Sequence, residues 1–168
     1  MIAICPGSFD PVTVGHMDII TRAASIFDKV YVAVLHNPKK NPAFTEEERV
    51  DMLRTATAEM NNVEVETWDG LLIDYAAEKK AGVIVKGLRA VSDYEYEFQM
   101  ALANRSLRPE IETVFLTTSS ENMFLSSSVV KQIASFGGDI SAFVPAELRD
   151  VIKERLLQQR SEMKNGKH

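Results

Sequence analysis

The sequence has a single cysteine, and it lacks an apolar run long enough to cross a membrane. Cys5 cannot form a disulfide within the chain, and no basic, hydrophobic leader precedes the first apolar run, so we expect a cytoplasmic protein. Basic residues are also in deficit, because 19 Lys and Arg oppose 24 Asp and Glu and give a net charge of −5. This balance argues against nucleic acid or an anionic membrane as a partner, but it allows a local basic cluster that binds a phosphorylated small molecule.

The sequence does contain a regular alternation of apolar runs and amphipathic stretches. The apolar runs predict strands at 2–5, 30–35, 63–65, 83–85 and 113–117. Apolar residues at helical spacing predict helices that begin near His16, Thr45, Leu71, Ser92, Ser126 and Pro145. Thr45 with Glu48 and Ser92 with Glu95 have capping-box spacing, and the serines from Ser126 are candidate N-caps. This order is typical of the α/β class, and it predicts a doubly wound five-stranded parallel sheet in one domain, 1–157. A polar tail, 158–168, follows, and we expect it to continue the last helix in part.

The most informative stretch reads Pro-Gly-Ser-Phe-Asp-Pro at 6–11, with Gly15 and His16 closing it. It lies between the first predicted strand and the first predicted helix. In an open α/β sheet this crossover binds phosphates, because free backbone N–H groups and the positive end of the helix dipole face the crevice. Ser8 adds a hydroxyl and His16 an imidazole that can donate to a phosphate oxygen. The alternative interpretation is a proline-bounded turn with a capping histidine.

The glycine patterns of the dinucleotide fold and of the P-loop are both missing, because Leu88 and Arg89 follow Gly87 where a P-loop needs Lys and Ser or Thr. No Ser-His-Asp set and no metal cage is indicated by spacing. Cations and hydroxyls instead follow the predicted strands, at 39–40, at Lys86 and Arg89, and at 126–128. Parallel strands bring these ends together, which predicts a site for several phosphates and a transfer reaction that needs no protein nucleophile.

Four separated motifs, in this order, resemble the phosphopantetheine adenylyltransferase family, within the nucleotidyltransferase superfamily that carries a T/H-x-G-H signature. The resemblance covers about 2–156. Its motifs are the 6–16 stretch, Phe-Thr with Glu-Glu-Arg at 44–49, Gly-Leu-Arg-Ala at 87–90 with Asp-Tyr-Glu-Tyr-Glu at 93–97, and Ser-Ser-Ser at 126–128 with Lys131.

The resemblance implies a Rossmann-like nucleotidyltransferase fold and the reversible transfer of AMP from ATP to 4′-phosphopantetheine, which gives dephospho-coenzyme A and pyrophosphate. It implies catalytic roles for His16, Lys40 and Ser8, and acceptor binding by Ser8, Lys40, Leu72 and Lys86. It implies ATP binding by Ser8, Phe9, His16, Gly87, Leu88, Arg89, Glu97, Asn122, Met123, Phe124, Leu125, Ser126, Ser127 and Ser128. Mg²⁺ is expected to arrive with ATP rather than to occupy a protein site. The resemblance also implies a homo-oligomer, a hexamer.

Two positions depart from the family pattern: Lys86 stands where Arg is common, and Asn122-Met123 replaces an aromatic-Ser pair. Lys86 keeps the charge but lacks the bidentate fork of an arginine. Two other functions remain open from the residues. One is a related nucleotidyltransferase with a different phosphorylated acceptor, such as nicotinamide mononucleotide, or one that uses CTP with a phosphoalcohol. The other is a flavodoxin-like binding module, which would not need His16.

Overall fold

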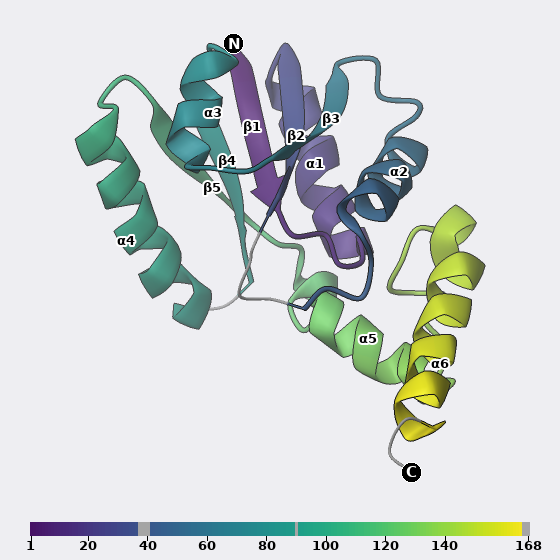
Figure 1. Cartoon of the computed structure of the whole chain (residues 1–168). Helices are drawn as coiled ribbons and strands as arrows, with labels where there is room; N and C mark the ends of the chain where they lie inside the picture. The colour runs from purple at the N-terminus through teal and green to yellow at the C-terminus, as the bar shows by residue number, and fades with distance from the viewer. Residues whose placement is uncertain (37–40, 90, 166–168) are drawn as a thin grey trace.

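The computed structural model describes residues 1–36, 41–89 and 91–165, and the side chains of 91 and 92 are outside the description. Strands and helices alternate from the N-terminus to Thr117, after which the described chain is helical or loop (Figure 1). The strands are β1 Ile2–Gly7, β2 Lys29–Leu35, β3 Val63–Trp68, β4 Val83–Leu88 and β5 Glu112–Thr117. The helices are α1 Val14–Ile26, α2 Glu46–Ala56, α3 Leu72–Glu78, α4 Val91–Leu107, α5 Ser127–Ser135 and α6 Arg149–Asn165, with short 3₁₀ turns at Ser120–Asn122 and Ala146–Leu148.

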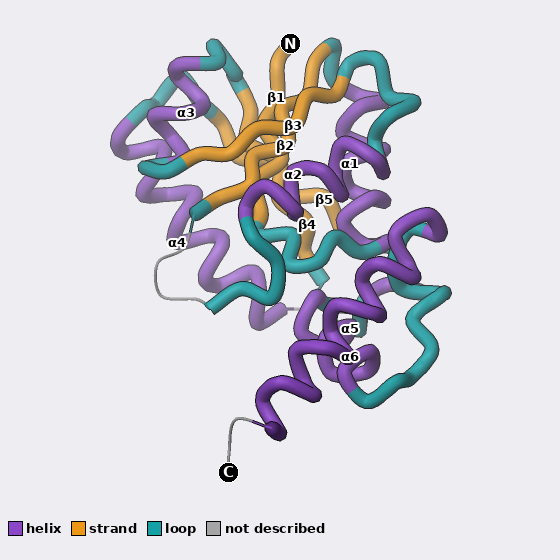
Figure 2. The backbone as a smooth tube through the Cα atoms, turned by 45° about the vertical axis from the view of Figure 1, so that its right-hand side comes forward, coloured by secondary structure: helices purple, strands orange, loops and turns teal. Residues whose placement is uncertain are grey.

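The sheet has the order β3-β2-β1-β4-β5, and every neighbouring pair is parallel. This confirms the predicted doubly wound α/β fold. The order reverses at β1, so the loop after β1 lies at the switch point where open α/β sheets bind ligands. In Figure 1 the arrow of β1 points toward α5, and Figure 2 also shows α5 and α6 beyond this carboxyl edge of the sheet.

Three strands extend further toward the carboxyl edge of the sheet than the apolar runs predict. The prediction that β4 ends at Val85 is wrong, because Lys86, Gly87 and Leu88 pair with β5 up to Thr117. Polar and glycine residues masked this extension in the sequence. Gly87 is required there for packing, since a Cβ would come within 2.9 Å of Ile19 Cγ1 on α1. Strands β1 and β3 likewise continue to Gly7 and Trp68.

Alternating side chains of the sheet build two cores on its two faces. One face packs Ala3, Cys5 and the valines of β2 against α1, α2, α5 and α6. The other packs Ile4, Ala33 and Ile84 against Ile73, Tyr75 and Ala76 of α3. The layers therefore account for why the apolar runs of β1 and β2 are continuous rather than alternating.

The C-terminal helix differs from its prediction at its start. Pro145 does not begin it directly, because the 3₁₀ turn Ala146–Leu148 intervenes before α6. The helix then continues past 157 to Asn165, in line with the expectation that the polar tail continues it in part. Gln159 and Arg160 in that part donate to the carbonyls of Ala43 and Ser135. These two side chains anchor the helix to the domain, whereas 161–165 are exposed.

Helix α4 carries apolar side chains that the fold leaves uncovered. Its exposed members are Tyr94, Tyr96, Phe98, Met100, Leu102 and Leu107, and Tyr96 is 65% exposed. The predicted capping box of Ser92 with Glu95 falls partly on side chains outside the description. Among the described residues, no helix is both long enough and apolar enough to span a membrane.

Candidate active site

A cavity of about 510 Å³ lies at the carboxyl ends of β1, β2 and β4. Its wall is built from the loop after β1, the start of α1, the end of β4 and the start of α5. Its polar lining consists of Ser8, Asp10, Thr13, His16, His36, Lys86, Arg89, Glu97, Thr118, Ser126, Ser127, Ser128 and Lys131. The structure therefore brings together cations, hydroxyls and an imidazole in a chain whose net charge is −5. This local excess of donors is suited to a polyphosphate.

The loop at 7–9 is closely packed around its backbone. Phe9 has a φ of 49°, a left-handed conformation that is uncommon for a bulky residue, and its ring is only 4% exposed. A Cβ on Gly7 would lie 2.8 Å from that ring, so glycine is needed there. The buried Arg49 of α2 donates from Nη1 to the carbonyl of Ser8 at 2.8 Å. These contacts fix the backbone that presents Ser8 to the cavity.

His16 is both the capping residue of α1 and part of the cavity wall. The backbone N–H of Thr13 donates to His16 Nδ1 at 3.0 Å, and His16 N donates to Thr13 Oγ1 at 3.3 Å. This reciprocal arrangement is a capping box with histidine at the third helical position. A backbone N–H can only donate, so Nδ1 must carry the lone pair and the proton of the neutral ring must be on Nε2. The cap thus leaves Nε2–H as the ring donor for a ligand.

The surroundings of His16 also keep its ring neutral. Burial, with a smaller contribution from the Arg89 guanidinium, lowers the pKa of His16 from 6.5 to about 4. The ring of Phe9 packs edge-on against it, with centroids 5.0 Å apart. At neutral pH the site therefore holds an uncharged, oriented N–H donor.

The start of α5 forms the opposite wall of the cavity. Ser126 is its N-cap and accepts from the N–H of Val129, and Ser127 Oγ donates to the Pro11 carbonyl at 2.7 Å. The predicted N-cap at Ser126 is confirmed. Arg89 donates to the Leu125 carbonyl at 2.9 Å and to Asp93. A helix N-terminus flanked by a guanidinium is a favourable place for phosphate oxygens.

Lys86 and Glu97, which the resemblance implies for different substrates, form an ion pair with each other. Lys86 Nζ lies 3.2 Å from Glu97 Oε2, and each side chain is 22% exposed. Both residues line the cavity. Glu97 therefore limits where the Lys86 ammonium can point.

Several predicted residues lie outside the cavity lining. Leu88 is the last residue of β4 and does not line the cavity, Leu72 packs at the edge of the α3 core, and the Asn122 amide donates to Ser119 Oγ. Met123 and Phe124 are 53% and 60% exposed. Lys40 falls on residues outside the description. Nothing in the structure tests the roles that the resemblance implies for these residues.

Sequence reasoning assigned no role in the site to Thr13, Asp10 or Arg49, although Thr13 opens the T-x-G-H signature and Arg49 belongs to the 44–49 motif. The T-x-x-H spacing of the cap was a readable signal for Thr13, provided that histidine is accepted at the third helical position. No local signal in the sequence indicates a role for Asp10, because its carboxylate accepts hydrogen bonds from residues far along the chain, the N–H groups of 43–44 and the ammonium of Lys131.

Cys5 and His36 also line the cavity. Burial raises the pKa of the Cys5 thiol to about 12, so this residue is a packing residue and not a nucleophile. His36, at the end of β2, pairs with Glu46, and this contact raises its pKa. Among 1–36, 41–89 and 91–165, no group of three His, Cys, Asp or Glu side chains could hold a metal ion.

Comparison with known proteins identifies the family. The cytidylyltransferase-like family matches 4–133 of this chain. The phosphopantetheine adenylyltransferase of Caldanaerobacter subterraneus subsp. tengcongensis is 56% identical over 157 residues, which cover 94% of this chain and 96% of the relative. That of Clostridium perfringens is 54% identical over 161 residues, covering 96% and 98%. The chain belongs to the phosphopantetheine adenylyltransferase family. This confirms the resemblance carried by the four motifs.

A third phosphopantetheine adenylyltransferase, from Alkaliphilus metalliredigens, is 60% identical over 144 residues, covering 86% of this chain and 92% of the relative. Solved structures agree on the fold at lower identity. The nicotinic acid mononucleotide adenylyltransferase of Plasmodium falciparum, in complex with NaAD, is 14% identical with a TM-score of 0.67, covering 94% of this chain and 95% of that one. A Vibrio parahaemolyticus protein assigned as a nicotinate-nucleotide adenylyltransferase has a TM-score of 0.65 at 19% identity, covering 95% and 93%. The phosphopantetheine adenylyltransferase family thus shares its fold with other adenylyltransferases.

Proposed function

We propose that this protein transfers the adenylyl group of ATP to 4′-phosphopantetheine, giving dephospho-coenzyme A and pyrophosphate. The observation that carries the proposal is the neutral His16 ring, whose cap fixes Nε2–H as a donor in a cavity walled by the start of α5. Membership of the family supports the choice of substrates.

The reaction needs alignment and charge stabilisation more than acid or base chemistry. The acceptor phosphate is already ionised, so one of its oxygens attacks the α-phosphorus directly while pyrophosphate leaves from the opposite side. His16 Nε2–H donates to an oxygen of the α-phosphate, where negative charge builds up. Arg89 and the first N–H groups of α5 hold the departing phosphates, and Lys86 attracts the acceptor phosphate.

Magnesium is proposed to enter as part of the ATP complex and to neutralise triphosphate charge. The donor set of the cavity fits this, because its carboxylates are already engaged by cations, Glu97 by Lys86 and Asp10 by Lys131. Lys40 is proposed as a further contact to the reacting phosphates on the family resemblance alone. The free Cys5 thiol supports a reducing cytoplasm as the compartment.

The experiment that tests the function is pyrophosphate release from ATP and Mg²⁺, with mass analysis of the products. Parallel reactions contain 4′-phosphopantetheine, nicotinamide mononucleotide or no acceptor. We expect pyrophosphate and a dephospho-coenzyme A mass with phosphopantetheine only. Turnover with the mononucleotide alone would overturn the substrate, and release of orthophosphate instead of pyrophosphate would overturn adenylyl transfer.

We further propose that the protein is a homo-oligomer, a hexamer as the family resemblance implies. Support comes from α4, whose uncovered aromatic and aliphatic side chains form the kind of face that a subunit interface covers. Native mass spectrometry should give a multiple of the 18.8 kDa chain. Replacing Tyr96 and Leu102 by Asp should lower the mass toward one chain, and a monomeric wild-type protein would contradict the proposal.

A further inference from the structure

Three segments that are distant in sequence meet at the carboxylate of Asp10. Asp10 Oδ1 accepts from the N–H of Phe44 at 2.9 Å, and Oδ2 accepts from the N–H of Ala43 at 3.0 Å and from Lys131 Nζ at 2.8 Å. Asp10 is 6% exposed. A buried carboxylate is costly unless its oxygens are satisfied, and here three donors from two other parts of the chain satisfy it.

Lys131 is the partner of Asp10 that faces the cavity. It lies on α5, one turn after Ser127, its side chain is 32% exposed, and it lines the cavity wall. A lysine without a partner samples many rotamers, and ordering it on a ligand costs up to about 2 kcal/mol of side-chain entropy. The ion pair removes part of that freedom before any ligand binds.

The remaining contacts of the loop hold Asp10 itself in place. Ser127 Oγ binds the Pro11 carbonyl on the α5 side, and Arg49 binds the Ser8 carbonyl on the α2 side. Arg49 Nε also donates to the Phe44 carbonyl, so Phe44 is bound at its N–H by Asp10 and at its oxygen by Arg49. Asp10 is therefore fixed from both sides, and its carboxylate is a rigid acceptor rather than a mobile one.

We propose that Asp10 is a positioning residue, which acts on the adenylyl transfer by holding the Lys131 ammonium where it meets the triphosphate of ATP. The inference rests on the proposed function and deepens it. Asp10 touches no reacting atom. It leaves Lys131 with N–H donors for phosphate oxygens, because an ammonium has three and the pair uses one.

The test is a double-mutant cycle with Asp10→Asn, Lys131→Met and the double variant. Asn keeps the size of the side chain and one acceptor oxygen for the backbone, but it removes the charge that orients Lys131. We expect each single variant to lower kcat/KM for ATP by about 10- to 100-fold, the range of a lost charged hydrogen bond. The kcat/KM of the double variant should equal that of the less active single variant within about threefold, because both substitutions break the same ion pair. KM for phosphopantetheine should stay unchanged in all three.

Asp139, which is exposed, and Lys153, which is half-buried, provide a control pair of the same residue types outside the cavity. Asp139 accepts from the backbone N–H of Ser141 at 2.9 Å, and this bond, with a smaller contribution from the Lys153 charge, lowers the pKa of Asp139. Asp139→Asn and Lys153→Met should therefore leave turnover at the wild-type value. Additive losses in the Asp10–Lys131 cycle, or a fall in melting temperature with wild-type turnover, would overturn the positioning role.

If Asp10→Asn does not fold, Lys131 is tested in the wild-type background. Lys131→Arg should recover part of the activity that Lys131→Met loses, since Arg can keep the pair with Asp10, and equal activity of the two would overturn the inference. Binding of α,β-methylene-ATP to the wild type and to each variant, measured by calorimetry, distinguishes failure of the proposed adenylyl transfer from failure of the positioning role of Asp10. An inactive wild type that binds the analogue refutes the adenylyl transfer, whereas an active wild type with unchanged Lys131→Met refutes only the positioning role.

Discussion

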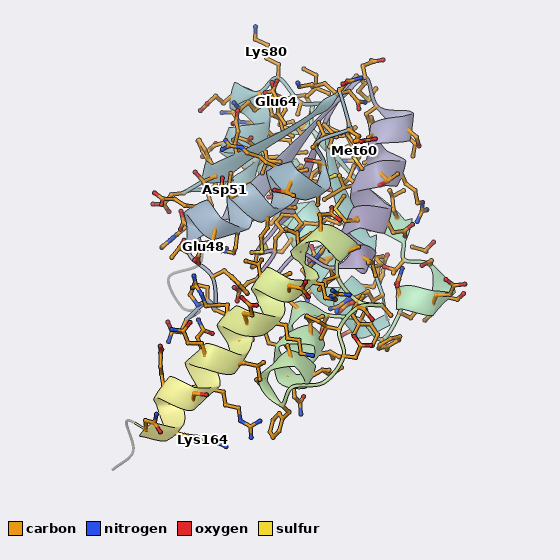
Figure 3. The ribbon with its side chains drawn as sticks, turned by 90° about the vertical axis from the view of Figure 1, so that its right-hand side faces the viewer. Glu48, Asp51, Met60, Glu64, Lys80 and Lys164 are labelled. Atoms are coloured by element: carbon orange, nitrogen blue, oxygen red, sulfur yellow. The ribbon has the colours of Figure 1, made fainter. Side chains whose placement is uncertain are left out.

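Helices α1 and α2 begin with the same local device and use it for different ends. In α2, Thr45 caps the helix and Glu48 accepts from the Thr45 N–H at 2.8 Å. In α1, Thr13 caps the helix and His16 accepts from the Thr13 N–H at 3.0 Å. Glu48 has a further partner in Arg155 of α6, and Figure 3 labels Glu48 at the start of α2, near α6. Both Glu48 oxygens are thereby committed to structure.

The difference lies in what the third helical residue has left after capping. A carboxylate can only accept, and it binds a cation of the fold. An imidazole that accepts at Nδ1 must donate at Nε2, so the cap itself creates an oriented donor at the cavity. The third helical residue is therefore only a cap when it is Glu48, but it is also a candidate catalytic group when it is His16, whose second ring nitrogen donates at the cavity.

The largest effect is expected for His16→Asn, a variant that keeps the cap of α1 and removes the Nε2–H donor. The side-chain oxygen of Asn can occupy the position of His16 Nδ1 and accept from the Thr13 N–H. The shorter Asn side chain has no atom at the position of Nε2, so the donor is lost. We expect kcat to fall about 100- to 1,000-fold, as for removal of a preorganised donor to developing charge, with ATP binding nearly intact. Steady-state pyrophosphate release and calorimetry measure the two quantities.

The matched variant is His16→Gln, whose amide nitrogen reaches the place of Nε2. It should retain more turnover than His16→Asn, although its cap is weaker. Equal turnover in the two variants would show that the ring acts through its shape and not through Nε2–H. Near wild-type turnover in His16→Asn or His16→Ala would remove His16 from the mechanism.

The next largest effect is the pH dependence of the free energy of unfolding, to which His16 contributes through its lowered pKa. The pKa of His16 falls from 6.5 to about 4 on folding. Below pH 6.5 the unfolded chain therefore binds a proton that the folded protein excludes, so this group stabilises the fold above pH 6.5 and the contribution is lost as the pH falls toward 4. Its size is at most about 3 kcal/mol.

Urea unfolding of wild type and His16→Asn at pH 7, 6 and 5 measures this effect. The free energy of unfolding of the wild type should drop more steeply with acid than that of the variant, which lacks the titrating group. The raised pKa of His36 acts in the opposite direction, but it is present in both proteins and cancels in the difference. Parallel curves would mean that His16 titrates normally in the folded state.

The smallest effect concerns the two capping threonines. Thr45→Val and Thr13→Val each remove one side-chain acceptor from a helix start, and each should lower the free energy of unfolding by about 1 kcal/mol. Only Thr13→Val should also lower turnover, because Thr13 Oγ1 lies 3.1 Å from His16 Nδ1. Equal turnover in both variants would indicate that the backbone N–H of Thr13 suffices to hold the ring.

The sequence predicts features that depend on neighbouring residues and misses those that depend on distant ones. The Thr45–Glu48 capping box, the Ser126 cap and the parallel alternation could be predicted because each is written in a few consecutive residues. The extension of β4 could not, since only pairing with β5 makes Lys86 and Gly87 strand residues.

The site shows the same division. His16 could be placed in the first turn of α1 from spacing, and its cap was considered as an alternative to a ligand role. The structure shows that the capping contact and the position at the cavity coexist. Asp10 could not be assigned, because its partners lie 33, 34 and 121 residues away. Nor could the exposure of the apolar face of α4, which depends on how the helix packs on the sheet.

The most direct measurement of the central claim is the tautomer of His16, by ¹⁵N NMR of the protein labelled at histidine. The chain has three histidines, so the ring signals of His16 can be identified by their loss in His16→Asn. At pH 7 we expect an unprotonated Nδ1 and a protonated Nε2, and a shift of the Nε2 signal when α,β-methylene-ATP binds. A proton on Nδ1, or an Nε2 signal that ignores the nucleotide, would contradict the account.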